Sequence, residues 1–169
     1  HDESVRLASQ FRCNGSDGYI AFINDVLGIR HTANWNGFDM DYDLQIYDDP
    51  CEMREALRKK NLINNKARLL AGYCYEWRTQ KSNGMEVFDI ELPNGFRAKW
   101  NFSNTNTWAI DADSFDQVGC IHTSQGLEFD YAGVIIGNDL RYENEHVITD
   151  ATKRAKSDKS LNGLKSGQD

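Results

Sequence analysis

Apolar and polar positions alternate along the chain with two different periods, and these periods separate the expected helices from the expected strands. Residues 16–27 carry apolar side chains at helical spacing before Gly28, which predicts an amphipathic helix that ends there. Asp48-Asp49-Pro50 predicts the start of a second helix, running to about Lys60 or Leu62, because an acidic cap precedes a proline. Strands are expected where short apolar or alternating runs lie between turn residues, at 5–12, 44–47, 68–75, 86–92, 96–102, 118–123 and 131–137.

The order of these elements predicts a fold class. The run RLLAGYCY (68–75) is apolar almost throughout, as in strands buried on both faces of a parallel sheet, and a helix precedes it. Residues 86–102 alternate around Pro93-Asn94-Gly95, which predicts a hairpin, and residues 140–149 predict another around Asn144. We therefore expect an α/β domain whose central sheet is mainly parallel and carries a β-hairpin insertion.

Domain boundaries follow from where these patterns stop. The elements above belong to one domain over residues 1–150, with the hairpin insertion at about 85–103. Residues 151–169 are basic and poor in apolar side chains, so we expect them to form a flexible tail.

Composition and charge narrow the functional classes. The chain has 169 residues, a formal net charge of −7 and four cysteines without a C-x-x-C pair. The acidic charge argues against an extensive basic surface for nucleic acid, and the cysteine pattern excludes an ordinary zinc ribbon. No apolar run approaches the roughly 18 residues of a membrane span, so we expect a soluble, cytoplasmic protein that does not contact a membrane. The first residue is His1 rather than Met, which suggests a piece of a larger protein.

The stretch VGCIHTSQGLEFDYAGVII (118–136) holds the main candidate for chemistry. It places a polar, glycine-containing loop between two strands that are expected to be buried. In parallel α/β sheets, ligands bind just beyond the carboxyl ends of the strands, so this loop is a candidate binding site. An ordinary polar connection, with Gly126 supplying a turn, explains the same residues about equally well.

This stretch also resembles a known motif. CIHTSQGLEFDYAGVII is similar to motif V of the superfamily 1 helicases, although Gln125 stands where lysine is commoner. LASQFRCNGSDGYIAFIN (7–24) is similar to motif IV of the same enzymes, with Cys13 in place of the usual serine. Together the two segments resemble the second RecA-like domain of a superfamily 1 helicase-like protein. More narrowly, the chain resembles the C-terminal half of a bacterial P-loop family related to the Schlafen helicase domain.

The resemblance implies roles for individual residues. Arg12 becomes a candidate arginine finger that stabilises phosphoryl transfer on a nucleotide held by another domain. Gln125, Gly126 and Glu128 would approach the nucleotide, with Glu128 near the ribose hydroxyls. His122 and Thr123 would lie toward single-stranded DNA or RNA. A surface or ion-paired arginine and a hydrogen-bonded histidine at a strand end are the structural alternatives for Arg12 and His122.

Other parts of such a motor are absent from the sequence. No G-x-x-x-x-G-K-[ST] segment occurs, so the first RecA-like domain, which would bind ATP and Mg²⁺, is expected elsewhere in a parent protein. The chain alone is therefore not expected to hydrolyse ATP or to bind a metal ion. Residues 70–117 are too few for the helical subdomain that many unwinding relatives insert, which leaves a translocase or a switch possible. The alternative function is a RecA-like interaction module that binds protein or nucleic acid without turnover.

Two further residue groups have simpler explanations than a binding site. Trp77, Trp100 and Trp108 could stack on bases, but we expect them to serve packing. Asp89 and Glu91 on the predicted hairpin do not have the spacing expected of a nuclease, which favours a solvated face.

Overall fold

The computed structural model describes residues 17–30, 42–82, 86–102 and 107–156, and the chain divides into two compact units, residues 1–46 and residues 47–169. In the first unit, α1 (Asp17–Val26) ends in a turn where Gly28 has a φ of 64°. The ring of Tyr19 stacks on that of Tyr42, with centroids 4.4 Å apart. The helix predicted over 16–27, ending at Gly28, is confirmed. The strand predicted over 5–12 lies outside the described residues.

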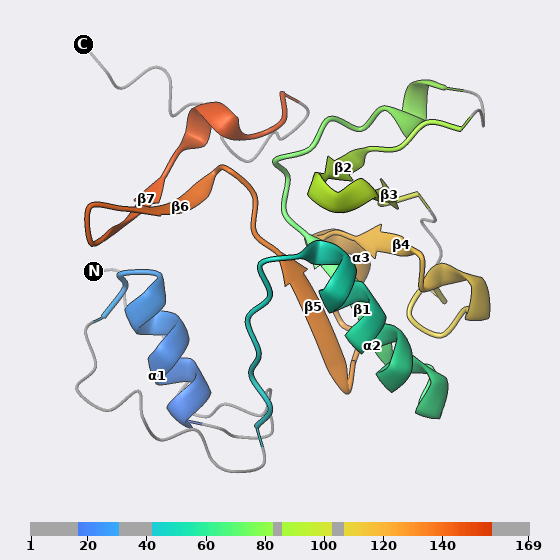
Figure 1. Ribbon diagram of the computed structural model, residues 1–169, viewed down its shortest axis with the longest axis horizontal. Coiled ribbons are helices and arrows are strands. Elements are labelled where there is room, and N and C mark those ends of the chain that lie inside the picture. Colours follow the sequence, from blue (N-terminus) through green and yellow to red (C-terminus); the bar gives the residue numbers. More distant parts are fainter. Residues whose placement is uncertain (1–16, 31–41, 83–85, 103–106, 157–169) are drawn as a thin grey trace, which may run out of the picture. The chain divides into compact units, whose positions relative to one another are not determined.

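A five-stranded sheet forms the centre of the second unit (Figure 1). Its strands are β1 (Ala67–Ala71), β2 (Ile90–Leu92), β3 (Phe96–Trp100), β4 (Gln117–Gly119) and β5 (Tyr131–Ile135), in the order β2-β3-β4-β1-β5. Strands β3, β4, β1 and β5 are parallel, and only β2 runs antiparallel to its neighbour β3. The predicted α/β class, with a mainly parallel sheet and an added hairpin, is confirmed.

The remaining elements of this unit are short. A separate two-stranded sheet joins β6 (Leu140–Glu143) to β7 (His146–Thr149) through Asn144 and Glu145, both with positive φ, as the hairpin predicted around Asn144 requires. The helical turn α3 (Ile121–Ser124) follows β4. The described residues also form the 3₁₀ turns η2 (Thr79–Lys81), η3 (Pro93–Gly95), η4 (Ala112–Ser114) and η5 (Ala151–Lys153).

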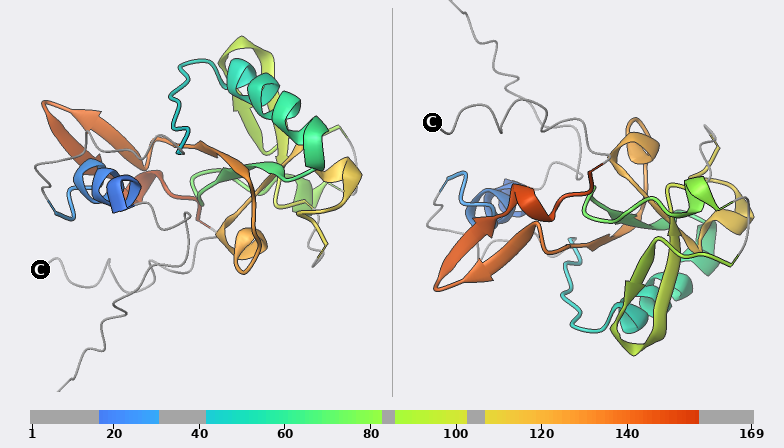
Figure 2. Two further views of the ribbon diagram at one scale, coloured as in Figure 1. Left: turned by 90° about the horizontal axis from the view of Figure 1, so that it is seen from below. Right: turned by 90° about the horizontal axis from the view of Figure 1, so that it is seen from above.

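Helix α2 (Pro50–Asn64) begins and ends where its capping residues dictate. The carboxylate of Asp49 accepts a hydrogen bond from the Cys51 amide at 2.8 Å, and Asn65 closes the helix in the left-handed conformation. The helix packs on β1 and β5, where a Cβ at Gly133 would lie 2.3 Å from Leu57 Cδ1. Gly133 therefore allows α2 to approach the sheet closely. Figure 2 shows α2 on one side of β1 and β5 and the turn α3 on the other.

The hairpin of β2 and β3 follows the predicted Asn-Gly turn. Asn94 and Gly95 both adopt positive φ, at 60° and 77°. The hairpin forms one edge of the sheet and curves toward α2 (Figure 2), and the Arg54 guanidinium donates a hydrogen bond of 3.1 Å to the carbonyl oxygen of Arg97. This contact joins the hairpin to the helix.

Arg68 on β1 is fully buried, although the sequence pattern marks this strand as apolar. Its guanidinium donates to six oxygen acceptors on Asn61, Asn65, Ala67, Asp111 and Ser114, at distances between 2.8 and 3.2 Å. Burial lowers the pKa of Arg68, and the charge of Asp111 opposes this shift. The six bonds join the end of α2, the start of β1 and the segment before β4.

The tryptophans and the buried aspartate on the hairpin serve packing. Trp100 and Trp108 are fully buried, and Trp108 lies so close to β4 that a Cβ at Gly119 would be 2.6 Å from its ring. The packing interpretation of these two residues is confirmed. Asp89 is buried and accepts bonds of 2.8 Å from the amides of Thr79 and Trp100, so the solvated face expected there is wrong for this residue.

Several predicted strands differ from the structure in extent. No strand forms at 44–47, where Ile46 is 85% exposed instead of buried in a sheet. β1 ends at Ala71 instead of residue 75, and β4 ends at Gly119 instead of residue 123. For both β1 and β4, apolar residues continue past the last residue that pairs with a neighbouring strand.

The Arg68 network predicts a large and specific loss of stability. Arg68→Lys keeps the charge but removes the forked donors, so most of the six hydrogen bonds that satisfy this buried charge are lost. We expect the free energy of unfolding to fall by about 3 kcal/mol or more in urea titration. The control is Arg58→Ala, which removes the exposed ion pairs to Glu55 and Asp116 and should cost about 1 kcal/mol or less. Equal losses in the two variants would contradict the role assigned to Arg68.

Candidate functional site at the carboxyl edge of the sheet

The candidate loop begins at the carboxyl end of β4, which lies between β3 and β1 in the sheet. Cys120 is buried at this end, and α3 starts with the next residue. His122 and Thr123 lie in this helical turn, so the strand predicted over 118–123 is wrong for these two residues. The turn exposes His122 to solvent and leaves Thr123 half-buried.

The Thr123 side chain holds the turn together. Its hydroxyl accepts a hydrogen bond of 2.7 Å from the Cys120 amide and donates one of 3.0 Å to the Cys120 carbonyl oxygen. The Ser124 amide donates to the same carbonyl oxygen at 3.0 Å. The Thr123 hydroxyl is thus occupied in fixing the backbone from which His122 projects.

His122 rests against an aromatic side chain from the neighbouring strand. Tyr73 follows β1, and its ring meets the imidazole edge-on with centroids 5.6 Å apart. Tyr73 is itself held by an edge-on contact of 4.8 Å with the buried Trp100, and its hydroxyl lies 3.9 Å from Cys120 Sγ. The imidazole is therefore exposed at the sheet edge but supported from below by a fixed ring.

The three residues assigned to the nucleotide lie in the loop between α3 and β5. Gln125, Gly126 and Glu128 are all exposed. Gly126 has a φ of 83° with open space around it, so the backbone conformation explains the glycine. The loop then returns to the sheet, where Asp130 accepts a hydrogen bond of 2.5 Å from the Asn64 amide group.

Beyond the ends of β1 and β5 lies a pocket of about 320 Å³ that the sequence analysis did not identify. Cys74, Tyr75, Gly137, Asn138 and Lys153 contribute to its lining. The signal was present in the sequence, since short polar segments that follow two neighbouring parallel strands meet at the same edge. The start of the predicted tail also reaches this region, because the Ala155 amide donates to the Tyr73 carbonyl oxygen at 2.7 Å.

Two titratable groups in this pocket are shifted toward their neutral forms. Burial, reinforced by the nearby charge of Asp139, raises the pKa of the Cys74 thiol to about 11. Burial also raises the pKa of Tyr75, with Cys74 adding to the shift. A glycine is needed at position 137, because a Cβ there would lie 2.1 Å from Cys74 Sγ. The pocket thus presents a protonated thiol and phenol at neutral pH.

Five of the six predicted site residues lie close together in the chain, and the sixth, Arg12, lies outside the described residues. His122, Thr123, Gln125, Gly126 and Glu128 lie on one turn and the loop after it. None of the three residues assigned to the nucleotide lines the pocket beyond β1 and β5. The exposed loop can therefore offer donors and acceptors to a nucleotide but does not enclose one.

The described residues offer neither a cluster of metal ligands nor a helix that could span a membrane. Nowhere in the described ranges do three His, Cys, Asp or Glu side chains group as metal ligands. Within the same ranges, no helix has both the length and the apolar composition needed to cross a membrane.

Comparisons with known proteins place these features in a family context. The family model described as Schlafen group 3, DNA/RNA helicase domain matches residues 1–168. Among curated proteins, the chain is 30% identical over 105 residues to "Uncharacterized protein YPL245W" of Saccharomyces cerevisiae. This match covers 60% of the chain and only 22% of the yeast protein. The narrower resemblance to a bacterial family stays a prediction. The assignment of the chain as a second RecA-like domain also stays a prediction. No solved structure matches the chain.

The shifted thiol predicts slow alkylation of Cys74 in the folded protein. Because the pKa is raised from 9.0 to about 11, the thiolate fraction at pH 9 is small, and greater intrinsic nucleophilicity offsets only part of this. We expect carbamidomethylation of Cys74 at pH 9 to be on the order of tenfold slower in the folded chain than in urea. The rate in the folded chain should rise through about pH 11. Peptide mass spectrometry measures both rates, and equal rates at pH 9 would contradict the shift.

Proposed function

The chain belongs to the Schlafen group 3 DNA/RNA helicase domain family, and we propose that it is the second RecA-like motor domain of a longer helicase-like or translocase NTPase. In this proposal the chain supplies one half of a composite ATP site and part of a track for single-stranded nucleic acid. The first RecA-like domain of the same parent protein holds ATP and Mg²⁺. The longer protein, and not this chain alone, is the ATPase.

The position of the motif V-like segment carries the proposal. The segment runs from the carboxyl end of β4, inside the parallel sheet, through α3 and the exposed loop to β5. This is the edge at which open α/β sheets bind ligands. A polar connection without a binding role would not need an exposed histidine that rests on the ring of Tyr73.

The proposed chemistry of the ATP site is electrostatic. Phosphoryl transfer spreads negative charge over the γ-phosphate oxygens, and a fixed cation close to them lowers the barrier. In the proposal Arg12 supplies this cation from the second domain. Glu128, whose exposed carboxylate has no hydrogen-bond partner among the described residues, accepts hydrogen bonds from the ribose hydroxyls. Mg²⁺, bound with ATP on the first domain, neutralises charge on the phosphates.

The proposed contact with nucleic acid uses the other end of the same segment. His122 is exposed and rigidly supported, so it can stack on a base or donate to a phosphate. Thr123 contributes indirectly, because its hydroxyl is occupied by the Cys120 backbone. Residues 70–117 hold a hairpin and short 3₁₀ turns in their described ranges, and no helical subdomain. This favours translocation or switching over unwinding.

Hydrolysis of ATP by the longer protein tests the motor. We expect single-stranded DNA or RNA to stimulate hydrolysis, and Arg12→Ala to lower the stimulated rate about 10³-fold or more. Arg6→Ala, which removes an arginine six residues earlier, is the matched control and should leave the rate within a few-fold of wild type. The rates are measured at saturating ATP with and without oligonucleotide.

The outcomes separate the two functions considered for this chain. An unchanged rate in Arg12→Ala would remove Arg12 from the ATP site. If the wild-type protein hydrolyses no ATP but still binds single-stranded nucleic acid, the chain is an interaction module without turnover, and the motor proposal fails.

A further inference from the structure

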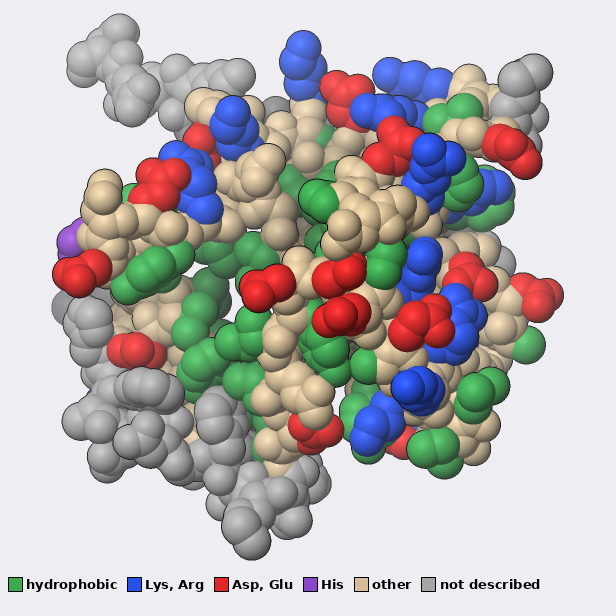
Figure 3. All heavy atoms as spheres, viewed as in Figure 1, with side chains coloured by type: hydrophobic (Ala, Val, Ile, Leu, Met, Phe, Trp, Pro, Cys, Tyr) green, Lys and Arg blue, Asp and Glu red, His purple; other side chains and the backbone are tan. Residues whose placement is uncertain are grey.

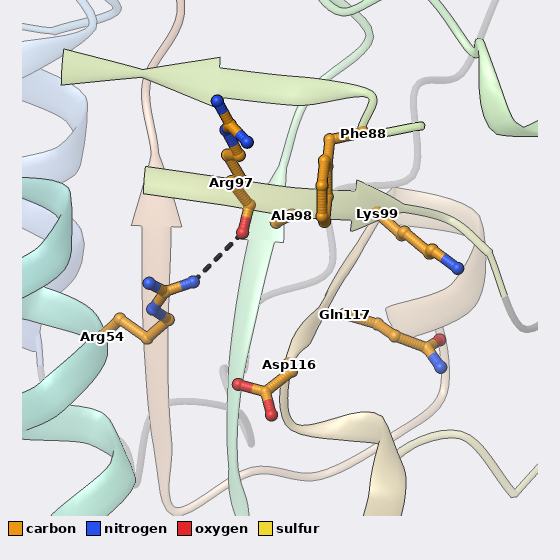
Figure 4. Close-up of a pocket in the computed structure, with 7 residues that line it drawn as sticks. All are labelled: Arg54, Phe88, Arg97, Ala98, Lys99, Asp116 and Gln117. Carbon is orange, nitrogen blue, oxygen red and sulfur yellow. Dashed lines mark hydrogen bonds between the residues drawn. The ribbon is translucent and has the colours of Figure 1, made fainter. Parts of the chain in front are cut away.

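A second pocket, of about 310 Å³, lies between α2, the hairpin and the start of β4. It is called the hairpin pocket here and is lined by Arg54, Phe88, Arg97, Lys99, Asp116 and Gln117 (Figure 4). None of these residues belongs to the motif V-like segment. Pairing in the sheet sets its geometry, since Lys99 on β3 lies opposite Gln117 on β4.

The charge of the hairpin pocket is opposite to that of the chain. Three cationic side chains line it, against the single carboxylate of Asp116. That carboxylate is already bound to Arg58, at 2.7 Å. The net charge of the whole chain is −7, so the local positive charge of the pocket is opposite in sign to it. Figure 3 shows Lys and Arg side chains interspersed with Asp and Glu over the side of the molecule that carries α2 and the hairpin.

The three cationic side chains of the hairpin pocket form few strong contacts with other described residues. Arg97 approaches Glu91 at 3.8 Å, and Glu91 is closer to Arg78 at 3.3 Å. Lys99 lies over the ring of Phe102 and has no ion pair among the described residues. Arg54 is held by its bond to the Arg97 carbonyl oxygen, while its Nε has no hydrogen-bond partner in the part of the chain that the structure describes. These groups can therefore bind an anion without first breaking a strong salt bridge.

An aromatic side chain lies between the cations. Phe88 is half-buried, and Figure 4 shows its ring standing between the side chains of Arg97 and Lys99. The Arg97 guanidinium is 5.9 Å from the centre of this ring. Cations that flank an aromatic ring are typical of surfaces that bind single-stranded nucleic acid, where phosphates meet the cations and a base meets the ring.

We propose that the hairpin pocket binds single-stranded nucleic acid, with Arg97 and Lys99 on phosphate oxygens, Arg54 supporting the positive potential and Phe88 contacting a base. This inference rests on the proposed function, because it assumes that the chain binds single strands, but it assigns that binding to residues outside the helicase-like motifs. A single strand fits better than a duplex, since the Phe88 ring needs an unstacked base.

Fluorescence anisotropy with labelled dT20 and U20 tests the assignment on the chain as it stands. We expect the double variant Arg97→Ala, Lys99→Ala to bind at least tenfold more weakly at about 0.1 M salt. Loss of two phosphate contacts should also reduce the slope of log K against log salt by about 1.4. Phe88→Leu keeps the apolar packing but removes the ring, and should weaken binding about fivefold with an unchanged slope.

The matched control removes the same charge elsewhere. Lys59 and Lys156 are exposed and lie outside the hairpin pocket, so Lys59→Ala, Lys156→Ala should change the affinity less than threefold. Circular dichroism should show both double variants folded, because the four side chains are not fully buried.

Each outcome has a distinct meaning. Wild-type binding with equal affinities in the two double variants would overturn the hairpin pocket and leave the proposed function intact. Absence of wild-type binding to either oligonucleotide would overturn both. Loss of labelled ATP binding in the pocket variant, with oligonucleotide binding unchanged, would overturn the assignment to nucleic acid and point to a free nucleotide.

Discussion

The buried guanidinium of Arg68 is the constraint on which the arrangement of the second unit depends. A charged group can be withdrawn from water only if its donors are satisfied, and six oxygen acceptors surround this one. Those acceptors come from three segments: the end of α2, the start of β1 and the turn around η4. None of the segments can move independently without leaving a buried charge unpaired.

This constraint extends to the candidate site through the sheet. Ser114, which binds Arg68, directly precedes Phe115 and the start of β4, so Arg68 helps to fix where β4 begins. β4 is three residues long and ends at Gly119, where the close ring of Trp108 excludes any larger residue. The turn that carries His122 and Thr123 starts immediately beyond. Placement of the histidine therefore depends on an arginine in the neighbouring strand, and the two do not touch.

Local sequence signals predicted those parts of the structure that depend on backbone chemistry. Asp49 and Pro50 start α2, and Asn94 with Gly95 makes the hairpin turn, because capping and positive φ are properties of a few neighbouring residues. The parts that failed depend on distant residues. Arg68 sits in an apparently apolar run because three of its six acceptors, on Asn61, Asp111 and Ser114, come from other segments of the chain. The ends of β1 and β4 were placed too late because a strand stops where its partner stops.

The two candidate sites also differ in whether neighbouring or distant residues form them. The motif V-like loop could be found from the sequence, because its residues are contiguous. The hairpin pocket could not, because Arg54, Phe88 and Gln117 come from three separate segments and meet only after folding. Conversely, the sequence led us to expect a direct role for Thr123, and the structure shows its hydroxyl occupied by the Cys120 backbone.

The two proposed nucleic-acid contacts lie at opposite ends of one short strand. Gln117, beside Lys99, begins β4, and α3 begins four residues later at Ile121, a span of about 13 Å along an extended chain. β4 cannot slide between them, because it pairs with β1 on one side and β3 on the other and is fixed by the Arg68 network. A signal from a bound nucleotide therefore cannot pass to the hairpin pocket by movement of β4. If the chain is a motor domain, the coupling of ATP hydrolysis to movement therefore lies outside β4, at the boundary with the first RecA-like domain.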